Sequence, residues 1–151
     1  MKNNRNFLFY GIGSVAFGIK GNAFSWFLFF YYNMVIGLPA WMASLALAIA
    51  TIWDAISDLI IGYSSDHTKS RLGRRHPYMY AALIPVPIFF VLLWNPPTFD
   101  TDFNLFLYLL IMAILVRTFT TLFEIPNQSL GPEITREYHE RTKMMSLRYF
   151  F

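Results

Sequence analysis

The chain has 151 residues, of which 56% are hydrophobic and 14% are charged, and its mean hydropathy is +0.41. This composition is far more apolar than that of soluble domains, so it excludes an ordinary soluble protein and predicts an all-α membrane protein. The sequence has no cysteine, which excludes disulfides and cysteine-ligated metal sites. The formal net charge of +3 raises the question of nucleic-acid binding, which the placement of the basic residues answers.

Four apolar segments are predicted to cross the membrane, because a hydrocarbon core about 30 Å thick needs roughly 20 helical residues. The helices are expected at about 7–32, 40–63, 78–94 and 103–129. The third segment contains Pro85 and Pro87 and is expected to be kinked rather than absent. A fifth apolar run occupies 144–151, so we expect an amino-terminal fragment with about four and a fraction transmembrane helices.

The basic residues are distributed asymmetrically along the chain. Ten of the twelve lysines and arginines lie within 2–5, 69–75 and 136–148, and the intervening loops near 33–39 and 95–102 have none. By the positive-inside rule the amino terminus and the loops after the second and fourth helices are cytoplasmic. We therefore expect a multi-pass membrane protein with a cytoplasmic amino terminus, and the basic clusters require no nucleic-acid partner. The expected location, a bacterial inner (plasma) membrane, goes with the family resemblance described below.

Two carboxylates, Asp54 and Asp58, lie one helical turn apart in the stretch "WDAISD" of the second helix. A charge at the bilayer centre costs at least about 2.5 to 3.5 kcal/mol on insertion scales, so such residues face a protein interior or an aqueous cavity. Adjacent carboxylates repel each other unless a proton or a metal cation lies between them. The pair predicts a coupling site for Na+ or H+. The alternative is that both aspartates pair with basic residues on neighbouring helices.

The fourth helix carries a matching polar face with spacings of four, three and four residues, made of Arg117, Thr121, Glu124 and Gln128. Asp54 and Arg117 each lie about 14 residues, or roughly 21 Å, into helices that run in the same direction, so a salt bridge is feasible. Arg117 is then either a structural counter-ion or a solute-binding residue. Lys20 in the first helix either lines the solute cavity or reaches the outer interface.

The loop "GYSSDHTKSRLGRRHP" at 62–77 follows the second helix and combines small, acidic and basic residues. Gly62 and Asp66 are expected to end that helix, and the run Gly73, Arg74 and Arg75 follows. A small residue lets helix ends approach, and a carboxylate beside basic side chains can form a cytoplasmic contact that opens during transport. The alternative is a solvated loop that only sets membrane topology.

The sequence does not predict an enzyme, because it lacks a nucleophile with a nearby base and lacks a cluster of metal ligands. Its three histidines, His67, His76 and His139, all fall in segments assigned to the cytoplasm, where a histidine is usually solvated. We expect no cofactor, and no metal beyond a possible Na+ at Asp54 and Asp58.

Three motifs in a fixed order resemble the glycoside-pentoside-hexuronide:cation symporter family of the major facilitator superfamily. They are "WDAISDLIIG", the long loop with its GxxxD…GRR pattern, and "FEIPNQSLGPEIT", and the resemblance runs from Tyr10 to the end. It implies a twelve-helix fold of two six-helix halves that rock around a central site. Residues 1–151 would then form part of the amino-terminal six-helix bundle, and the remaining carboxy-terminal helices would be its partners.

The resemblance also implies roles for individual residues. The family's paired helix-2 aspartates, which take part in Na+, Li+ or H+ coupling, correspond to Asp54 and Asp58. Its sugar-contacting acid on helix 4 corresponds to Glu124, and the arginine that opens helix 5 corresponds to Arg148.

Three departures from the family's best-known member weaken the assignment of its sugar substrate to this chain. An acidic sugar ligand on helix 1 is replaced by Gly18, an aromatic residue shortly after the helix-4 acid is replaced by Gln128, and Arg117 stands where a small residue is expected. The cation site is left intact by these changes.

The leading expectation is a cation-coupled secondary active symporter for a small polar solute, a sugar or an anionic sugar derivative, that works by alternating access. Reciprocal coupling between the two sites makes the solute gradient depend on the cation gradient. One alternative is a carrier of lysolipid-like or other amphiphilic solutes. Another is a non-transporting membrane sensor or scaffold. The expected partners are the solute, the coupling cation and the lipid bilayer.

Overall fold

The computed structural model describes residues 21, 23–68, 70 and 75–134, and the elements in this part of the chain are all helices. The chain divides into two compact units, one of residues 31–128 and one of residues 1–30 and 129–151. In the second unit a π-helix, η1 (Ala23–Phe27), leads directly into a short α-helix, α2 (Leu28–Phe30). The residues that carry the candidate site belong to the unit 31–128.

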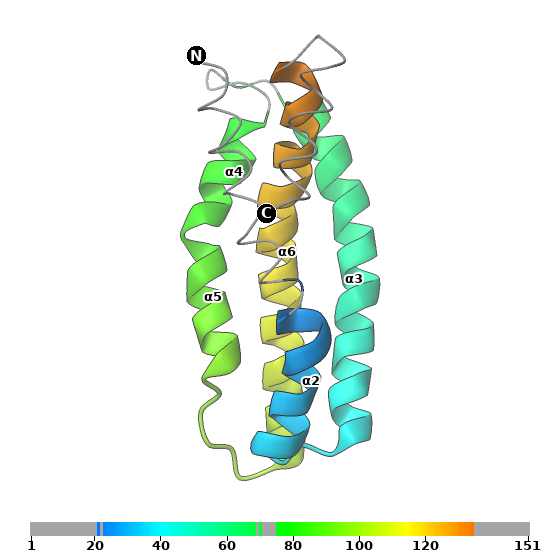
Figure 1. Cartoon of the computed structure of the whole chain (residues 1–151), viewed down its shortest axis with the longest axis vertical. Helices are drawn as coiled ribbons and strands as arrows, with labels where there is room; N and C mark the ends of the chain where they lie inside the picture. The colour runs from blue at the N-terminus through cyan, green and yellow to red at the C-terminus, as the bar shows by residue number, and fades with distance from the viewer. Residues whose placement is uncertain (1–20, 22, 69, 71–74, 135–151) are drawn as a thin grey trace. The chain divides into compact units, whose positions relative to one another are not determined.

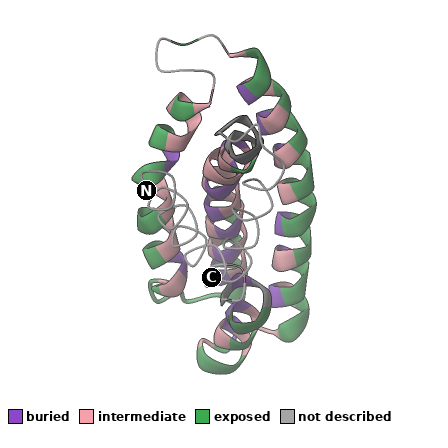
Figure 2. Cartoon of the chain, turned by 45° about the horizontal axis from the view of Figure 1, so that its top comes forward, coloured by how far each residue is buried: buried purple, intermediate pink, exposed green. Residues whose placement is uncertain are grey.

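The unit 31–128 is built from three long helical rods. Its elements are η2 (Tyr31–Val35), α3 (Ala40–His67), α4 (His76–Leu83), α5 (Pro85–Trp94) and most of α6 (Asp102–Ile134). In Figures 1 and 2, α6 lies between α3 on one side and α4 with α5 on the other. Within the described part of the chain, three helical stretches are long and apolar enough to cross a membrane: Ala40–His67, His76–Trp94 and Asp102–Gln128.

These three stretches correspond to the second, third and fourth predicted crossings. At the position of the predicted kink in the third crossing, the α-helix is interrupted at Ile84, between α4 and α5. Pro85 has no amide hydrogen to donate to the preceding turn, and its ring crowds the carbonyl four residues earlier. Most of the first predicted crossing and the fifth run at 144–151 lie outside the described residues.

A tight turn joins η2 to α3. Gly37 has a φ of +92°, a conformation that L side chains rarely adopt and that glycine adopts without strain. The amide of Leu38 donates to the carbonyl of Tyr32 at 2.9 Å, and the Nδ2 of Asn33 donates to the carbonyl of Leu38 at 2.9 Å. The first bond satisfies a carbonyl of η2 and the second satisfies a carbonyl of the turn, just before α3 begins at Ala40.

The buried face of α3 consists mainly of small residues. They recur at helical spacing and are Ala43, Ala46, Ala50, Ser57, Ile61 and Ser65. The opposite face exposes large apolar side chains, among them Ile52, Leu59 and Ile60 (Figure 2). Small residues inside and large residues outside are typical of membrane helices, which pack by close backbone approach while lipid solvates their apolar exterior. Asp54 lies four residues after Ala50 and three before Ser57, so it belongs to the buried face.

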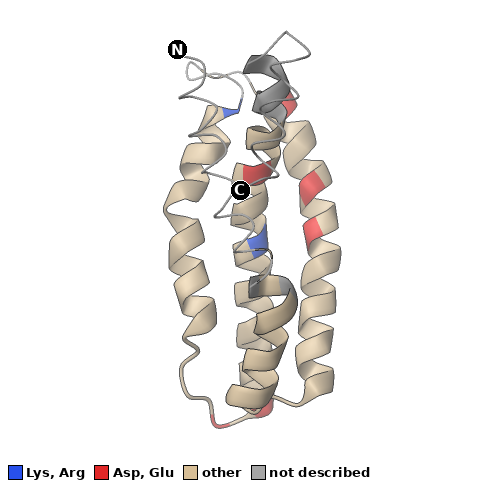
Figure 3. Cartoon of the chain, viewed as in Figure 1, with Lys and Arg blue, Asp and Glu red and all other residues tan. Residues whose placement is uncertain are grey.

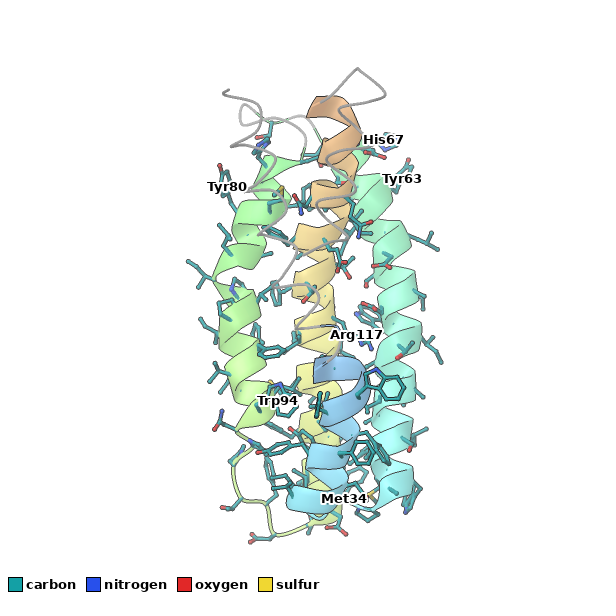
Figure 4. The ribbon with its side chains drawn as sticks, viewed as in Figure 1. Met34, Tyr63, His67, Tyr80, Trp94 and Arg117 are labelled. Carbon is teal, nitrogen blue, oxygen red and sulfur yellow. The ribbon has the colours of Figure 1, made fainter. Side chains whose placement is uncertain are left out.

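Side chains cap the end of α5 that is followed by the loop to α6. The hydroxyl of Tyr108 donates to the carbonyl of Leu92 at 2.7 Å, and that of Tyr32 donates to the carbonyl of Leu93 at 2.7 Å. The hydroxyl of Tyr31 donates to the carbonyl of Trp94 at 2.9 Å. The last carbonyls of a helix have no acceptor role within the helix, so they need such donors. Because the tyrosines come from η2 and α6, these bonds hold the ends of three elements together around Trp94, which Figure 4 labels.

Candidate functional site

An ion pair joins α3 to α6 at the centre of the unit 31–128. The Nη1 of Arg117 contacts the Oδ2 of Asp54, and the two side chains are 21% and 31% exposed. The Oγ1 of Thr121 lies 3.4 Å from the Oδ1 of the same aspartate. Both carboxylate oxygens of Asp54 therefore have a partner on α6. The salt bridge that the sequence indicated as feasible is formed, and Figure 4 labels Arg117 on α6.

Hydroxyl groups on both helices complete this contact. The Oγ1 of Thr51 lies 3.4 Å from the Nη2 of Arg117 and donates to the carbonyl of Leu47 at 2.8 Å. One residue from Asp54, the Nε1 of Trp53 donates to the Oγ1 of Thr118 at 2.8 Å. Further hydrogen bonds stabilise a charged pair that is partly removed from water, and Thr51 and Thr121 supply them to the Nη2 of Arg117 and the Oδ1 of Asp54.

Asp58 lies one turn beyond Asp54 on α3 and is partly buried. Its spacing of four residues from Asp54 and three from Ile61 places it on the same face of the helix. The Oγ of Ser57, between the two aspartates, donates to the main-chain carbonyl of Asp54 at 2.9 Å. In Figure 3 the charged positions within the unit follow α3 and α6, whereas α4 and α5 contain no Asp, Glu, Lys or Arg.

The polar face predicted for the fourth helix is present on α6. Arg117 and Thr121 contact Asp54, and one turn further the Nε2 of Gln128 donates to the Oε1 of Glu124 at 3.2 Å. A carboxylate oriented by an amide is a good acceptor for solute hydroxyl groups. The two other predicted solute-binding residues, Lys20 and Arg148, lie outside the described residues.

Asp66 and Arg75 form an ion pair at the carboxy-terminal end of α3. The Nη2 of Arg75 lies 3.0 Å from the Oδ1 of Asp66, and the arginine side chain is 12% exposed while the aspartate side chain is 57% exposed. This is the carboxylate-to-basic contact that the loop sequence predicted. Gly73 and Arg74, also predicted for this contact, lie outside the described residues.

The prediction that Gly62 ends the second helix is wrong, because α3 continues to His67, whereas Asp66 does lie in the last turn, one residue before that end. Its end is stabilised by the amide and Oγ1 of Thr68, which donate to the carbonyl of Ser64 at 3.1 and 2.8 Å. A Cβ added at Gly62 would lie 3.7 Å from the Cγ2 of Ile125 on α6, which is an ordinary van der Waals contact. The approach of the two helices therefore leaves room for a methyl group.

A hydroxyl cluster beside this loop was missed by the sequence analysis. The Oη of Tyr78 on α4 lies 2.5 Å from the Oγ of Ser64 and 2.8 Å from the Oγ1 of Thr68. Hydroxyl residues in a polar loop have no spacing that distinguishes bonded side chains from solvated ones.

The hydrogen bond of Trp53 was also missed, although the sequence contained a signal for it. An indole N–H inside a membrane span requires an acceptor.

Comparison of the amino-acid sequence with known proteins shows the family of this chain. The sequence model of the family described as MFS/sugar transport protein matches residues 9–151. An uncharacterized symporter of Synechocystis sp. is 38% identical over 149 residues, which cover 95% of this chain and 27% of that protein. An isoprimeverose transporter of Lactiplantibacillus pentosus is 28% identical over 141 residues, with 93% of this chain and 29% of that protein covered.

The name of a further relative gives a lipid as its solute. A sodium-dependent lysophosphatidylcholine symporter of Gallus gallus is 30% identical over 142 residues, which cover 93% of this chain and 26% of that protein. The chain thus spans less than a third of the length of each of these three relatives. All three are named as symporters or transporters, and none of the three is named as an enzyme. The chain belongs to the MFS/sugar transport protein family, in the glycoside-pentoside-hexuronide:cation symporter branch of the major facilitator superfamily.

Proposed function

We propose that this chain contributes the cation-coupling helices of a secondary active symporter that moves a small polar solute, a sugar or a sugar derivative, by alternating access. The observation that carries the proposal is the placement of Asp54 on the buried face of α3, with Asp58 one turn away and a polar face of α6 in contact. Charged residues are retained inside membrane spans mainly where they serve an ion or solute pathway. No covalent step is required.

The proposed cation site consists of oxygen donors. Asp54 and Asp58 supply carboxylates, and the hydroxyl of Thr121 lies 3.4 Å from the Oδ1 of Asp54. Carboxylate and hydroxyl oxygens are ligands suited to a hard cation such as Na+, and a carboxylate pair can instead share a proton. Cation binding would relieve the repulsion between the aspartates and favour the solute-binding state, which is the coupling that symport needs.

The proposed solute site lies further along α6. Glu124, oriented by Gln128, would accept hydrogen bonds from solute hydroxyls. Lys20 and Arg148 remain proposed solute-binding residues on the basis of the sequence. The sequence left Arg117 as a donor to an anionic solute or as a counter-ion. Its contact with Asp54 supports the counter-ion role, so Lys20 is the remaining basis for preferring an anionic sugar derivative.

A carrier of amphiphilic solutes is the second candidate. It is supported by the 30% identity to the symporter named for lysophosphatidylcholine. In an uptake assay, stronger competition by lysophosphatidylcholine than by neutral or uronate glycosides would favour this candidate. A non-transporting sensor or scaffold would show no uptake at all.

The test is solute uptake by the complete protein in vesicles, with and without an imposed Na+ or H+ gradient. Asp54→Asn and Asp58→Asn are expected to abolish stimulation by the cation while the protein still inserts. The matched control is Asp100→Asn, which makes the same chemical change on an exposed loop residue and should retain stimulation. Full cation-dependent accumulation by both helix variants would show that the proposed site is wrong.

A further inference from the structure

The carboxylate of Asp54 is the point where the proposed coupling cation and a protein cation meet. Its Oδ2 contacts the guanidinium of Arg117, and its Oδ1 lies 3.4 Å from the hydroxyl of Thr121. A Na+ ion that used Asp54 as a ligand would have to share or take an oxygen that already has a partner. A proton would meet the same obstacle, because protonation of Asp54 removes the charge that holds the guanidinium.

We propose that Arg117 is a tethered competitor of the coupling cation: it occupies Asp54 in the cation-free state and must leave that carboxylate for the cation to bind. The proposal rests on the cation-coupled function proposed above and assigns to Arg117 the control of apparent cation affinity. Arginine is suited to this role because its guanidinium stays charged and forms directional bonds to carboxylates.

Formal charges show why a competitor is useful at this position. Asp54, Asp58 and Arg117 together carry a net formal charge of −1, so one monovalent cation neutralises the set. Without the arginine the two aspartates carry −2 and would hold a cation more tightly. A transporter must release its cation on the far side, so a site that binds too tightly is slow to turn over. Arg117 would return to Asp54 as the cation leaves.

The structure supplies a nearby acceptor for the displaced guanidinium. The Nη2 of Arg117 is 3.4 Å from the Oγ1 of Thr51, whose hydrogen is directed to the carbonyl of Leu47. An oxygen that donates its hydrogen elsewhere still has lone pairs with which to accept. We therefore expect the guanidinium to keep its contact with Thr51 when it leaves Asp54.

Two other roles for Arg117 make different predictions. A purely structural counter-ion would stabilise the α3–α6 contact without occupying a cation ligand, so Arg117→Lys would lower the amount of folded protein and leave cation affinity unchanged. A solute-binding arginine would change the half-saturating concentration of an anionic solute. Only a competitor predicts that Arg117→Lys, which keeps the positive charge and weakens the contact with Asp54, makes the coupling cation bind more tightly.

The experiment measures the half-saturating concentration of the driving ion for solute uptake by the complete protein in proteoliposomes. Na+ is varied at fixed pH, and pH is varied at fixed Na+. In Arg117→Gln, which keeps a hydrogen-bonding group and loses the charge, the half-saturating concentration is expected to fall at least tenfold. Arg117→Lys keeps the charge and loses the paired N–H groups of the guanidinium. In this variant the half-saturating concentration is expected to fall about two- to fivefold.

The half-saturating ion concentration should fall in the order parent protein, Arg117→Lys, Arg117→Gln, and this order tests the proposal. An unchanged or increased half-saturating concentration in Arg117→Gln would overturn it. If that variant fails to insert, Arg117→Lys decides alone, and an unchanged or increased value in the lysine variant overturns it equally. The proposed coupling function fails in a distinguishable way, because uptake by the parent protein would then be insensitive to both Na+ and H+.

Discussion

The indole nitrogen of Trp53 shows how a polar atom inside an apolar span is satisfied at the scale of one residue. It donates to the Oγ1 of Thr118 at 2.8 Å, and that hydroxyl donates to the carbonyl of Ile114 at 2.8 Å. A polar group without a partner in an apolar environment costs more than the same bond contributes when it is made. The bond also fixes the register of α3 against α6 one residue away from Asp54.

Trp53→Phe and Thr118→Val should each destabilise the complete protein by about 0.5 to 1.5 kcal/mol, because each removes this hydrogen bond. The double variant should cost less than the sum of the two, with a coupling of about 0.6 kcal/mol, the average for hydrogen bonds between membrane helices. Denaturant titration in detergent measures all three. Trp41→Phe, an exposed tryptophan on the same helix, is the control. Strictly additive effects would contradict the interaction.

At the scale of the element, the end of α5 depends on donors from other elements. Three tyrosine hydroxyls and the Nδ2 of Asn95, which donates to the carbonyl of Val91 at 2.9 Å, satisfy four consecutive carbonyls. The proline-induced break at the start of α5 leaves a helix of only 10 residues. Anchoring of its other end therefore compensates for its short length, since short helices gain little stability from their own hydrogen bonds.

Tyr32→Phe should be the most damaging of the three tyrosine changes, because Tyr32 is fully buried. Removal of its hydroxyl leaves the carbonyl of Leu93 without that donor, at an expected cost of about 1 to 3 kcal/mol. The measurement is the midpoint of thermal unfolding for the complete protein in detergent. Tyr63→Phe, an exposed tyrosine on α3, should leave the midpoint unchanged. Equal effects of the two changes would argue against the cap.

At the scale of the whole molecule, charge asymmetry predicts how the bundle lies in the membrane. The end of α3 and the start of α4, where Asp66 and Arg75 form their ion pair, lie at one end of the unit 31–128 (Figure 1). The loop from α5 to α6, with Asp100 and with Asp102 at the start of α6, lies at the other end (Figure 1). Basic residues are retained on the cytoplasmic side, so the loop between α3 and α4 is expected to face the cytoplasm. The contact between Asp66 and Arg75 would then lie at the cytoplasmic face, where it could open during transport.

Cysteine labelling of intact cells tests this orientation. The chain has no cysteine of its own, so single substitutions can be labelled specifically once any cysteine elsewhere in the complete protein is replaced. Thr98→Cys should react with a membrane-impermeant maleimide added outside. Ser70→Cys should react only after the cells are permeabilised. The reverse pattern, or equal labelling of both, would reject the expected topology.

The sequence by itself determined the features that depend on one segment at a time. Apolar length predicted the three helical stretches that the structure describes as able to cross a membrane, and Pro85 predicted the break before α5. Helical spacing placed Arg117 and Thr121 on one face of the fourth helix, and both contact Asp54. These features follow from the local geometry of the backbone and from the thickness of the bilayer.

Only the tertiary structure decided which atoms meet. Asp54 and Arg117 are 63 residues apart, and Tyr32 and Leu93 are 61 apart, so no local pattern pairs them. Gly62 suggested a helix end, yet the hydrogen bonds of Thr68 to Ser64 carry α3 to His67. Partner choice depends on the rotation and depth at which two helices pack, and the small residues on the buried face of α3 permit the close approach that fixes both. Sequence spacing gives the face of a helix, whereas the neighbour of that face is set by packing.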